Sequence, residues 1–118
     1  MLVSLRNYSN YSICESNIKI DDLVNYASKN NLSAIGLTDY KLLSGSLEFS
    51  IKCQKAGIQP IIGLDIDYVS TLDHSKRATF ISKSEEGFKN INILSTEINT
   101  NNDFLLNLDN IKDFAKGN

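Results

Sequence analysis

The side chains that could do chemistry are few and widely spaced. His74 is the single histidine and lies in a polar stretch, and one imidazole cannot supply the several ligands that a zinc site requires. Cys14 and Cys53 lie too far apart for a Cys-Xaa-Xaa-Cys pair and are too few for a disulfide framework. We therefore expect His74 at the surface, and both cysteines as ordinary thiols that fill the core.

Three other patterns suggest chemistry only weakly. Ser44-Gly45-Ser46 lacks the Gly-Lys-Ser/Thr ending of a phosphate-binding loop. Glu85 and Glu86 are adjacent, so they face different directions, and they suit the start of a helix better than a catalytic pair. A base-stacking surface would need a basic groove beside its aromatic rings, and that groove is not expected around the tyrosines Tyr8, Tyr11, Tyr40 and Tyr68.

Composition narrows the classes of partner. Twelve basic and fourteen acidic residues give a formal net charge of −2, which provides no general attraction to the phosphate backbone of DNA. The apolar runs are far shorter than the roughly 20 residues of a membrane-spanning helix, and the N-terminus lacks the features of a signal peptide. We expect a cytoplasmic protein with no strong direct DNA binding and no membrane partner.

Apolar periodicity predicts where the strands lie. Alternation predicts a first strand over residues 2–6, and a short apolar run predicts a buried strand over residues 33–39 that ends at Asp39. A longer run over residues 61–69 predicts a strand that is buried first and half-exposed later. A turn over residues 71–76 and a fourth strand over residues 78–81 follow.

Helical spacing and capping residues predict the remaining elements. One apolar stripe predicts a helix over residues 20–30, and a second helix over residues 44–55 is closed by Gly57. Ser84 is expected to cap a third helix. From residue 103 onward the chain predicts a short extended piece and then a weak helix over residues 109–116.

Strand and helix alternate along the chain, which favours an α/β fold with a parallel sheet. With 118 residues, the chain holds one domain at most. Two architectures fit the pattern: the first part of a barrel, and a small open sheet.

Four segments carry a resemblance to a known family: VSLRNYS at residues 3–9, GLTDY at 36–40, KAGIQPIIGLD at 55–65 and SKSEEGFKN at 82–90. In this order and spacing they resemble the polymerase and histidinol phosphatase (PHP) domain that opens the alpha subunit of bacterial DNA polymerase III. The resemblance implies a distorted (β/α)7 barrel. Residues 1–118 would be its N-terminal part, with about four mostly parallel strands and three or four helices. The rest of the barrel and the polymerase core would lie outside this sequence.

The resemblance also implies a degenerate metal site. Metal-dependent relatives begin with a His-Xaa-His pair, and here those positions hold Arg6 and Tyr8. Their Thr-Asp-His segment corresponds to Thr38-Asp39-Tyr40, and their Gly-Xaa-Glu segment to Gly63-Leu64-Asp65. A later histidine aligns with Arg77, and Glu15 falls where an acidic ligand is usual. We call these seven positions the vestigial cleft: Arg6, Tyr8, Glu15, Asp39, Tyr40, Asp65 and Arg77.

For the vestigial cleft we expect no catalytic residue, no metal ligand and no cofactor, because guanidinium groups can neutralise the carboxylates directly. The implied role is structural, within an alpha subunit that performs DNA replication as a nucleotidyltransferase. The implied partners are the remainder of that subunit and a proofreading exonuclease. Two other hypotheses about function stay open. The chain could be a small stand-alone metal-dependent phosphoesterase that uses the remaining carboxylates, or a pure interaction module.

A partial barrel leaves strand edges and an apolar face uncovered. Residues 1–118 in isolation are therefore expected to self-associate as concentration rises. Sedimentation velocity over a concentration series measures this. A monodisperse monomer at the highest concentration would contradict the expectation.

Overall fold

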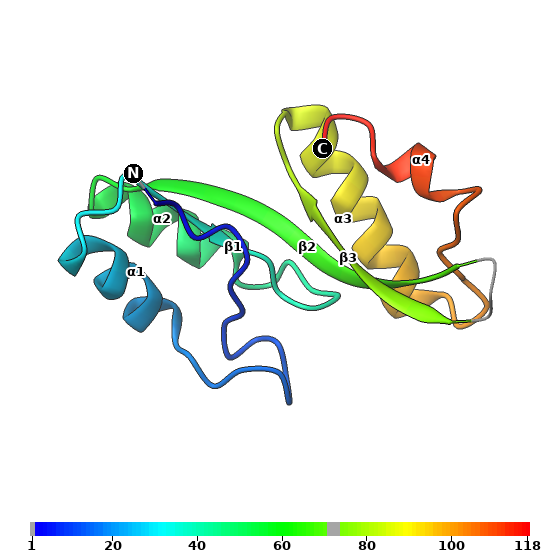
Figure 1. The fold of residues 1–118 in the computed structure, drawn as a ribbon, viewed down its shortest axis with the longest axis horizontal. Helices are drawn as coiled ribbons and strands as arrows, with labels where there is room; N and C mark the ends of the chain where they lie inside the picture. The colour runs from blue at the N-terminus through cyan, green and yellow to red at the C-terminus, as the bar shows by residue number, and fades with distance from the viewer. Residues whose placement is uncertain (1, 71–73) are drawn as a thin grey trace.

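The computed structural model describes residues 2–70 and 74–118, and within these ranges the chain forms three strands and four helices (Figure 1). Their order along the chain is α1 (Ile20–Lys29), β1 (Ala34–Leu37), α2 (Ser46–Lys55), β2 (Gln59–Val69), β3 (Ser75–Ile81), α3 (Glu85–Thr100) and α4 (Ile111–Phe114). The predicted helices over residues 20–30 and 44–55 are confirmed to within two residues. The predicted weak helix over residues 109–116 is shorter than expected.

The sheet is mixed, with the order β1-β2-β3. β1 pairs in parallel with the first half of β2, whereas β3 pairs antiparallel with the second half. The prediction of about four mostly parallel strands is therefore wrong. The link between Val69 and Ser75 is too short for the crossover that a parallel pair needs, so a hairpin is the only connection possible there. Part of the predicted turn, residues 71–73, lies outside the described residues.

The predicted first strand is an extended segment that lies beside β1 without being a regular strand. Two backbone bonds join it to β1: the Gly36 amide donates to the Ser4 carbonyl at 2.8 Å, and the Thr38 amide donates to the Asn7 carbonyl at 2.8 Å. A Cβ at Gly36 would overlap the Leu5 carbonyl oxygen, so the absence of a side chain allows this approach. The segment is thereby fixed against the edge of the sheet.

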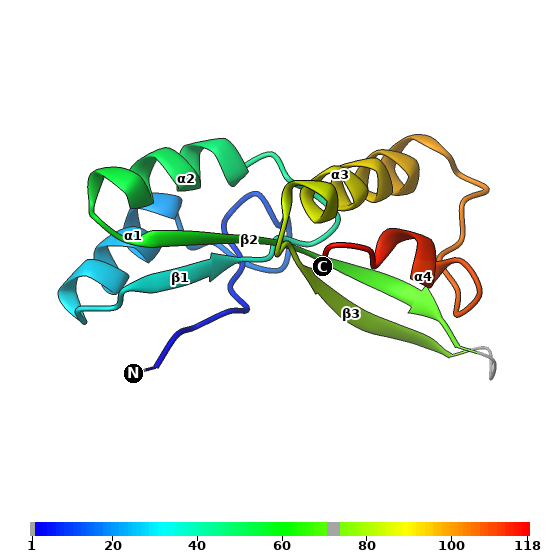
Figure 2. The same ribbon diagram turned by 90° about the horizontal axis from the view of Figure 1, so that it is seen from above.

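Two apolar clusters stabilise the fold, one at each end of β2. In the first, α1 and α2 pack against β1 around the fully buried Ile35 and Phe49. In the second, α3 packs against β2 and β3 around Leu64, Ile66 and Ile91. Figure 2 shows α2 and α3 on the same side of the sheet, with the long β2 running beneath both. Because β2 belongs to both clusters, it holds the two halves of the molecule together.

The burial of β2 differs from the prediction. The strand was expected to be buried first and half-exposed later, but its buried part is the middle, residues 63–66. Pro60, Ile61 and Ile62 are only half-buried. The reason is that β3 runs beside the second half of β2 alone, so the first half has a strand on one side only.

The capping predictions are confirmed. The Ser84 hydroxyl accepts a hydrogen bond from the Gly87 amide at the start of α3. Gly57, after α2, has a φ of 71°, a left-handed conformation that glycine adopts without strain.

Among the described residues, no helix is long and apolar enough to cross a membrane.

The two cysteines differ from each other. Cys53 is fully buried under α2, and burial raises the pKa of its thiol to about 11, so it is an unreactive core thiol as predicted. Cys14 was also predicted to fill the core, but it is exposed. It lies in a loop with a φ of 65°, and its neighbour Ile13 is also exposed, so their apolar character does not place them in the core.

A matched pair of alanine substitutions tests the close approach at Gly36. Gly36→Ala is expected to lower the free energy of unfolding by about 2–4 kcal/mol, because the new Cβ displaces the N-terminal segment from β1. Gly57→Ala has open space around its Cβ and should cost only about 1 kcal/mol through backbone strain. Urea unfolding measures both. Equal losses would show that the segment does not depend on this contact.

Candidate functional site

The centre of the vestigial cleft is the carboxylate of Asp65, in the middle of β2. Its side chain is fully buried, and a buried carboxylate is stable only when its oxygens are paired. The Arg6 guanidinium donates to Oδ2 at 2.9 Å and the Thr79 hydroxyl donates to Oδ1 at 2.7 Å. The Tyr8 hydroxyl also donates to Oδ2. Three side chains from the N-terminal segment and β3 therefore saturate both oxygens.

Arg77, on β3, forms the second part of the cleft. Its Nη2 lies 3.1 Å from Oε1 of Glu15, and its Nε lies 3.6 Å from Oδ1 of Asp67 and 3.9 Å from Oδ2 of Asp65. The guanidinium carbon lies 4.2 Å from the ring centroid of Tyr40, which is a cation–π contact. Arg77 thus links a loop carboxylate, two β2 carboxylates and an aromatic ring.

Asp39 does not join this group. Its carboxylate accepts hydrogen bonds from the Ser9 amide at 2.6 Å, the Ser9 hydroxyl at 2.7 Å and the Ser12 hydroxyl at 2.7 Å. All three side chains are buried. The Ser12 hydroxyl in turn accepts a hydrogen bond from the Tyr40 amide. Asp39 therefore fixes the loop that follows the N-terminal segment, and its oxygens face that loop.

The structure thus brings six of the seven predicted positions together and separates the carboxylate of the seventh, Asp39. Sequence reasoning missed Lys41, Asp67 and Thr79. Asp67 lies two residues after Asp65 on β2, so the alternation of a strand places both on one face and could have identified it. Lys41 and Thr79 carried no comparable signal. His74 is exposed, as predicted.

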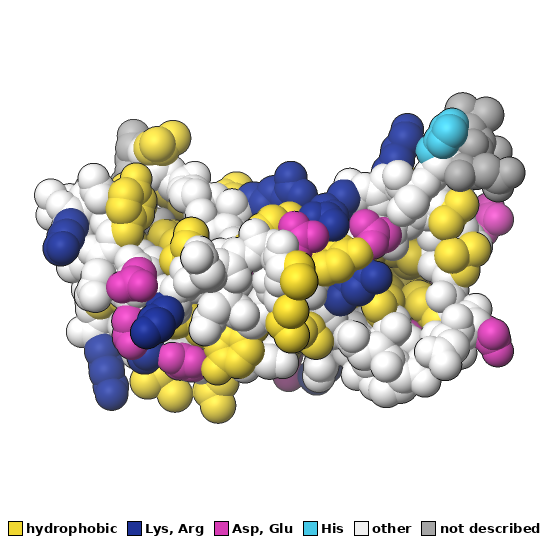
Figure 3. Space-filling model, turned by 90° about the horizontal axis from the view of Figure 1, so that it is seen from below, with side chains coloured by type: hydrophobic (Ala, Val, Ile, Leu, Met, Phe, Trp, Pro, Cys, Tyr) yellow, Lys and Arg dark blue, Asp and Glu magenta, His cyan; other side chains and the backbone are white. Residues whose placement is uncertain are grey.

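Charge is balanced in the group of ion pairs around Asp65 and Arg77. Three cations, Arg6, Lys41 and Arg77, face three anions, Glu15, Asp65 and Asp67. Figure 3 shows basic and acidic side chains intermixed near the middle of this face. The mixture gives no net field that would concentrate an anionic ligand such as DNA.

The protonation states favour the paired arrangement. The hydrogen bond to Asp65 raises the pKa of the Arg6 guanidinium, and the bond to Glu15 raises that of Arg77, so both stay charged at any working pH. Burial, together with the bond to Asp65, raises the pKa of the Tyr8 hydroxyl. The hydroxyl therefore remains protonated and able to donate.

The donor set does not fit a divalent metal ion. Such an ion needs free carboxylate or imidazole lone pairs that converge on one point. Both oxygens of Asp65 already accept from cationic or hydroxyl donors, and Glu15 is paired with Arg77. Among residues 2–70 and 74–118, no group of three histidine, cysteine, aspartate or glutamate side chains is arranged to hold a metal ion.

Comparison with known proteins identifies relatives across most of the chain. The family model described as the PHP domain matches residues 4–116. The DNA polymerase III subunit alpha of Rickettsia felis is 40% identical over 101 residues, which cover 86% of this chain and 8% of that protein. An error-prone DNA polymerase of Symbiobacterium thermophilum is 34% identical over 94 residues, which cover 80% and 8%. The chain therefore spans less than a tenth of the length of these curated relatives.

Two solved structures share the fold. A putative metal-dependent phosphoesterase from Bifidobacterium adolescentis superposes with a TM-score of 0.66 and 16% sequence identity, covering 97% of this chain and 43% of that one. An amidohydrolase from Chromobacterium violaceum gives a TM-score of 0.62 and 16% identity, covering 81% and 34%. At this identity the likeness establishes the fold alone.

Two conservative substitutions on β2 test the central role of Asp65. Asp65→Asn is expected to lower the free energy of unfolding by about 2–4 kcal/mol, because it removes the charge that Arg6 and Tyr8 are placed to compensate. Asp67→Asn is the matched control; its side chain is 34% exposed, and the loss should stay below about 1 kcal/mol. Chemical unfolding of both variants gives the comparison. A smaller loss for Asp65→Asn than for Asp67→Asn would contradict this view of the cleft.

Proposed function

Because this chain belongs to the PHP domain family, we propose that it is a structural, catalytically silent PHP segment of a bacterial DNA polymerase III alpha subunit. The observation that carries the proposal is the saturation of Asp65 by Arg6, Tyr8 and Thr79. A divalent ion would have to displace a guanidinium group that is already bonded to the one fully buried carboxylate of the cleft.

The positive charge that a metal ion would bring is supplied by the chain itself. Arg6 and Arg77 both lie within 4 Å of Asp65 Oδ2, at 2.9 and 3.9 Å. An arginine can bind a phosphate, but it does not lower the pKa of a bound water to generate a hydroxide nucleophile as a metal ion does. The cleft therefore retains the electrostatic balance of a metal site but has no means to activate water.

What the cleft does instead is hold separate parts of the chain together. Arg6 and Tyr8 come from the N-terminal segment, Asp65 from β2, and Thr79 and Arg77 from β3. Through its ion pair with Glu15, Arg77 also connects the loop that carries Glu15 to this group. Because these groups are far apart in sequence, their pairing stabilises tertiary contacts that no local interaction would maintain.

The larger setting is proposed from the relatives. Those named DNA polymerase III subunit alpha are more than ten times longer than the matched region. In such a chain, this segment would pack against the remainder of the subunit and could provide a surface for a proofreading exonuclease. The nucleotidyl transfer of DNA replication would take place outside these residues, and the location would be the cytoplasm.

A second function has two observations in its favour. The fold resembles a putative metal-dependent phosphoesterase, and three acidic residues of the cleft, Glu15, Asp39 and Asp65, remain in this chain. One observation opposes this function: the Asp39 carboxylate already accepts hydrogen bonds from Ser9 and Ser12. The third hypothesis is that the chain is a pure interaction module. Capture of polymerase subunits on the immobilised chain would support it.

Metal content and hydrolysis distinguish the first two functions. The purified protein is expected to contain no stoichiometric zinc, manganese or magnesium by elemental analysis, and to show no turnover of a chromogenic phosphoester with added Mn²⁺.

Two variants exclude a contaminating phosphatase in that assay. Asp39→Asn alters the cleft loop, whereas Asp103→Asn changes an exposed carboxylate outside the cleft. Turnover that disappears in Asp39→Asn and persists in Asp103→Asn would refute the silent-cleft proposal and favour the phosphoesterase. Turnover that is equal in both variants would come from another protein.

A further inference from the structure

A short segment reaches from one half of the molecule to the other. It consists of residues 40–43, which we call the strap, and it lies in the connection between β1 and α2. Both of these elements contribute to the first apolar cluster, yet Leu43 of the strap packs against the second. Figures 1 and 2 both show the connection extending toward α3 before it returns to α2. The strap therefore joins the two halves independently of β2.

Lys41 has the least favourable backbone conformation of the strap. Its φ is 62°, a left-handed value that a residue with a Cβ adopts only at a cost. Such a conformation persists when the surrounding groups hold it from several sides. On one side, the Lys41 amide donates to the carbonyl of Asp65 at 2.8 Å. The Lys41 ammonium also lies 3.6 Å from Oδ2 of Asp67. These contacts attach the residue to β2.

Two side chains of α3 hold Lys41 from the other side. The Ser95 hydroxyl donates to the Lys41 carbonyl at 2.8 Å, and the Asn99 side-chain amide donates to the same oxygen at 2.7 Å. Because Ser95 and Asn99 are four positions apart, they lie on one face of the helix. Ser95 is buried, and its own carbonyl accepts from the Asn99 side chain at 2.7 Å. The carbonyl of one strained residue is therefore fixed by two donors of α3.

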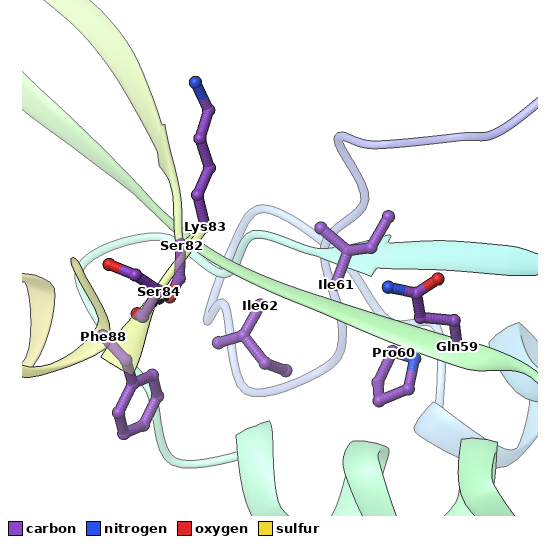
Figure 4. Close-up of a pocket in the computed structure, with 8 residues that line it drawn as sticks. All are labelled: Gln59, Pro60, Ile61, Ile62, Ser82, Lys83, Ser84 and Phe88. Carbon is purple, nitrogen blue, oxygen red and sulfur yellow. Dashed lines mark hydrogen bonds between the residues drawn. The ribbon is translucent and has the colours of Figure 1, made fainter. Parts of the chain in front are cut away.

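The helix has few other polar links to the first half. Where α3 begins, an open hollow of about 290 Å³ is lined by Ile62 of β2 and Phe88 of α3. Figure 4 shows these two side chains on the same side of the sheet. Among the described residues, the hydrogen bonds from α3 to the part of the chain before β2 both end on the Lys41 carbonyl. The strap is thus the point at which α3 acts on that part of the chain.

The strap also carries the aromatic ring of the vestigial cleft. The Tyr40 hydroxyl donates to Asp67. The Tyr40 ring centroid lies 4.2 Å from the guanidinium carbon of Arg77 and 4.9 Å from the ammonium of Lys41. Tyr40 and Lys41 are adjacent, so a rotation of the backbone at Lys41 moves the ring relative to Arg77. The cation–π contacts of the cleft therefore depend on the conformation of Lys41.

We propose that Ser95 and Asn99 are positioning residues for the vestigial cleft: they hold the Lys41 carbonyl, and the strap in turn holds the Tyr40 ring against Arg77. The coupling is a series of direct contacts, from helix donor to carbonyl, from backbone to ring and from ring to guanidinium. Through it, α3 controls the geometry of a site that its own side chains do not enter. This inference goes beyond the proposed function, since it applies whether or not the cleft is catalytically silent.

Nuclear magnetic resonance of the 118-residue chain, at a concentration where it sediments as a monomer, tests the proposal with two signals. The Tyr40 ring current shifts the Arg77 side-chain Nε–H resonance upfield, and hydrogen exchange reports on the Lys41 amide. In the double variant Ser95→Ala, Asn99→Ala, the Arg77 resonance should lose most of its upfield shift. The Lys41 amide should exchange about tenfold faster or more, because the carbonyl of the same residue is released.

Two other amides separate positioning from a general loss of stability. The Gly36 amide donates to the Ser4 carbonyl in the first half, and the Val69 amide donates to the Leu106 carbonyl in the second. Neither bond involves the strap. In the double variant both amides should stay within about threefold of their native exchange rates.

Three substitutions serve as controls. Thr96→Ala removes an exposed hydroxyl of α3 that donates only within the helix, to the Asn92 carbonyl at 2.9 Å, and should leave both signals unchanged. Ser95→Thr keeps the donor and should restore the Arg77 shift that Ser95→Ala loses. Asn99→Ala alone changes an exposed side chain, so it tests the coupling even where substitution at the buried Ser95 disturbs packing.

Three results would overturn the proposal. Unchanged Arg77 and Lys41 signals in the double variant show that α3 does not hold the strap. Equal acceleration of the Lys41, Gly36 and Val69 amides shows a general destabilisation. An effect of Thr96→Ala as large as that of Asn99→Ala shows that the helix as a whole, and not these two donors, is responsible.

The outcome is separable from that of the proposed function. Metal content and phosphoester hydrolysis report on whether the cleft is silent, whereas the Arg77 and Lys41 signals report on what holds it in place. A metal-free, inactive protein whose signals ignore Ser95 and Asn99 would refute this inference alone. A metal-loaded, active protein in which the coupling is present would refute the silent cleft alone.

Discussion

A buried carboxylate at the centre of the longest strand is the constraint on which the rest of the site depends. Asp65 is fully buried, and an ionised carboxylate in that position is unstable unless its oxygens are paired. Bulk solvent does not reach this side chain, and neighbouring elements supply the donors. The N-terminal segment brings Arg6 and Tyr8, and β3 brings Thr79. The need to compensate one charge therefore fixes how three separate parts of the chain are placed.

The same strand explains the architecture around the site. β2 pairs with β1 over its first half and with β3 over its second half, and each half belongs to a different apolar cluster. Asp65 lies near the start of the second half, one position after the fully buried Leu64. A polar network at this position links elements from both halves. The apolar clusters alone would stabilise each half and would specify less closely how the halves meet.

Local signals predicted the helices well and the sheet less well. The caps Ser84 and Gly57, and the apolar stripe of α1, depend on neighbours in sequence, so the residue pattern was sufficient. The direction of β3 depends on the short link after Val69, and that length favours a hairpin over the parallel strand we had expected. In the cleft, the residue types predicted that no imidazole is present at the positions that the resemblance assigns to metal ligands. They could not show that Asp39 faces Ser9 and Ser12, because those contacts span 27–30 residues.

In the proposed silent cleft, arginine side chains take the role that a metal ion would have, and this changes what the cleft depends on. A bound ion is in equilibrium with solvent, so the charge that it compensates is exposed whenever the ion leaves, and chelators or low pH can remove it. Arg6 and Arg77 are attached to the chain, and their raised pKa values keep them charged under all working conditions. The carboxylates of the cleft are then neutralised without any ligand. Under this proposal the cleft has no open coordination position of the kind on which metal-dependent hydrolysis depends, and its ion pairs link the N-terminal segment to the sheet.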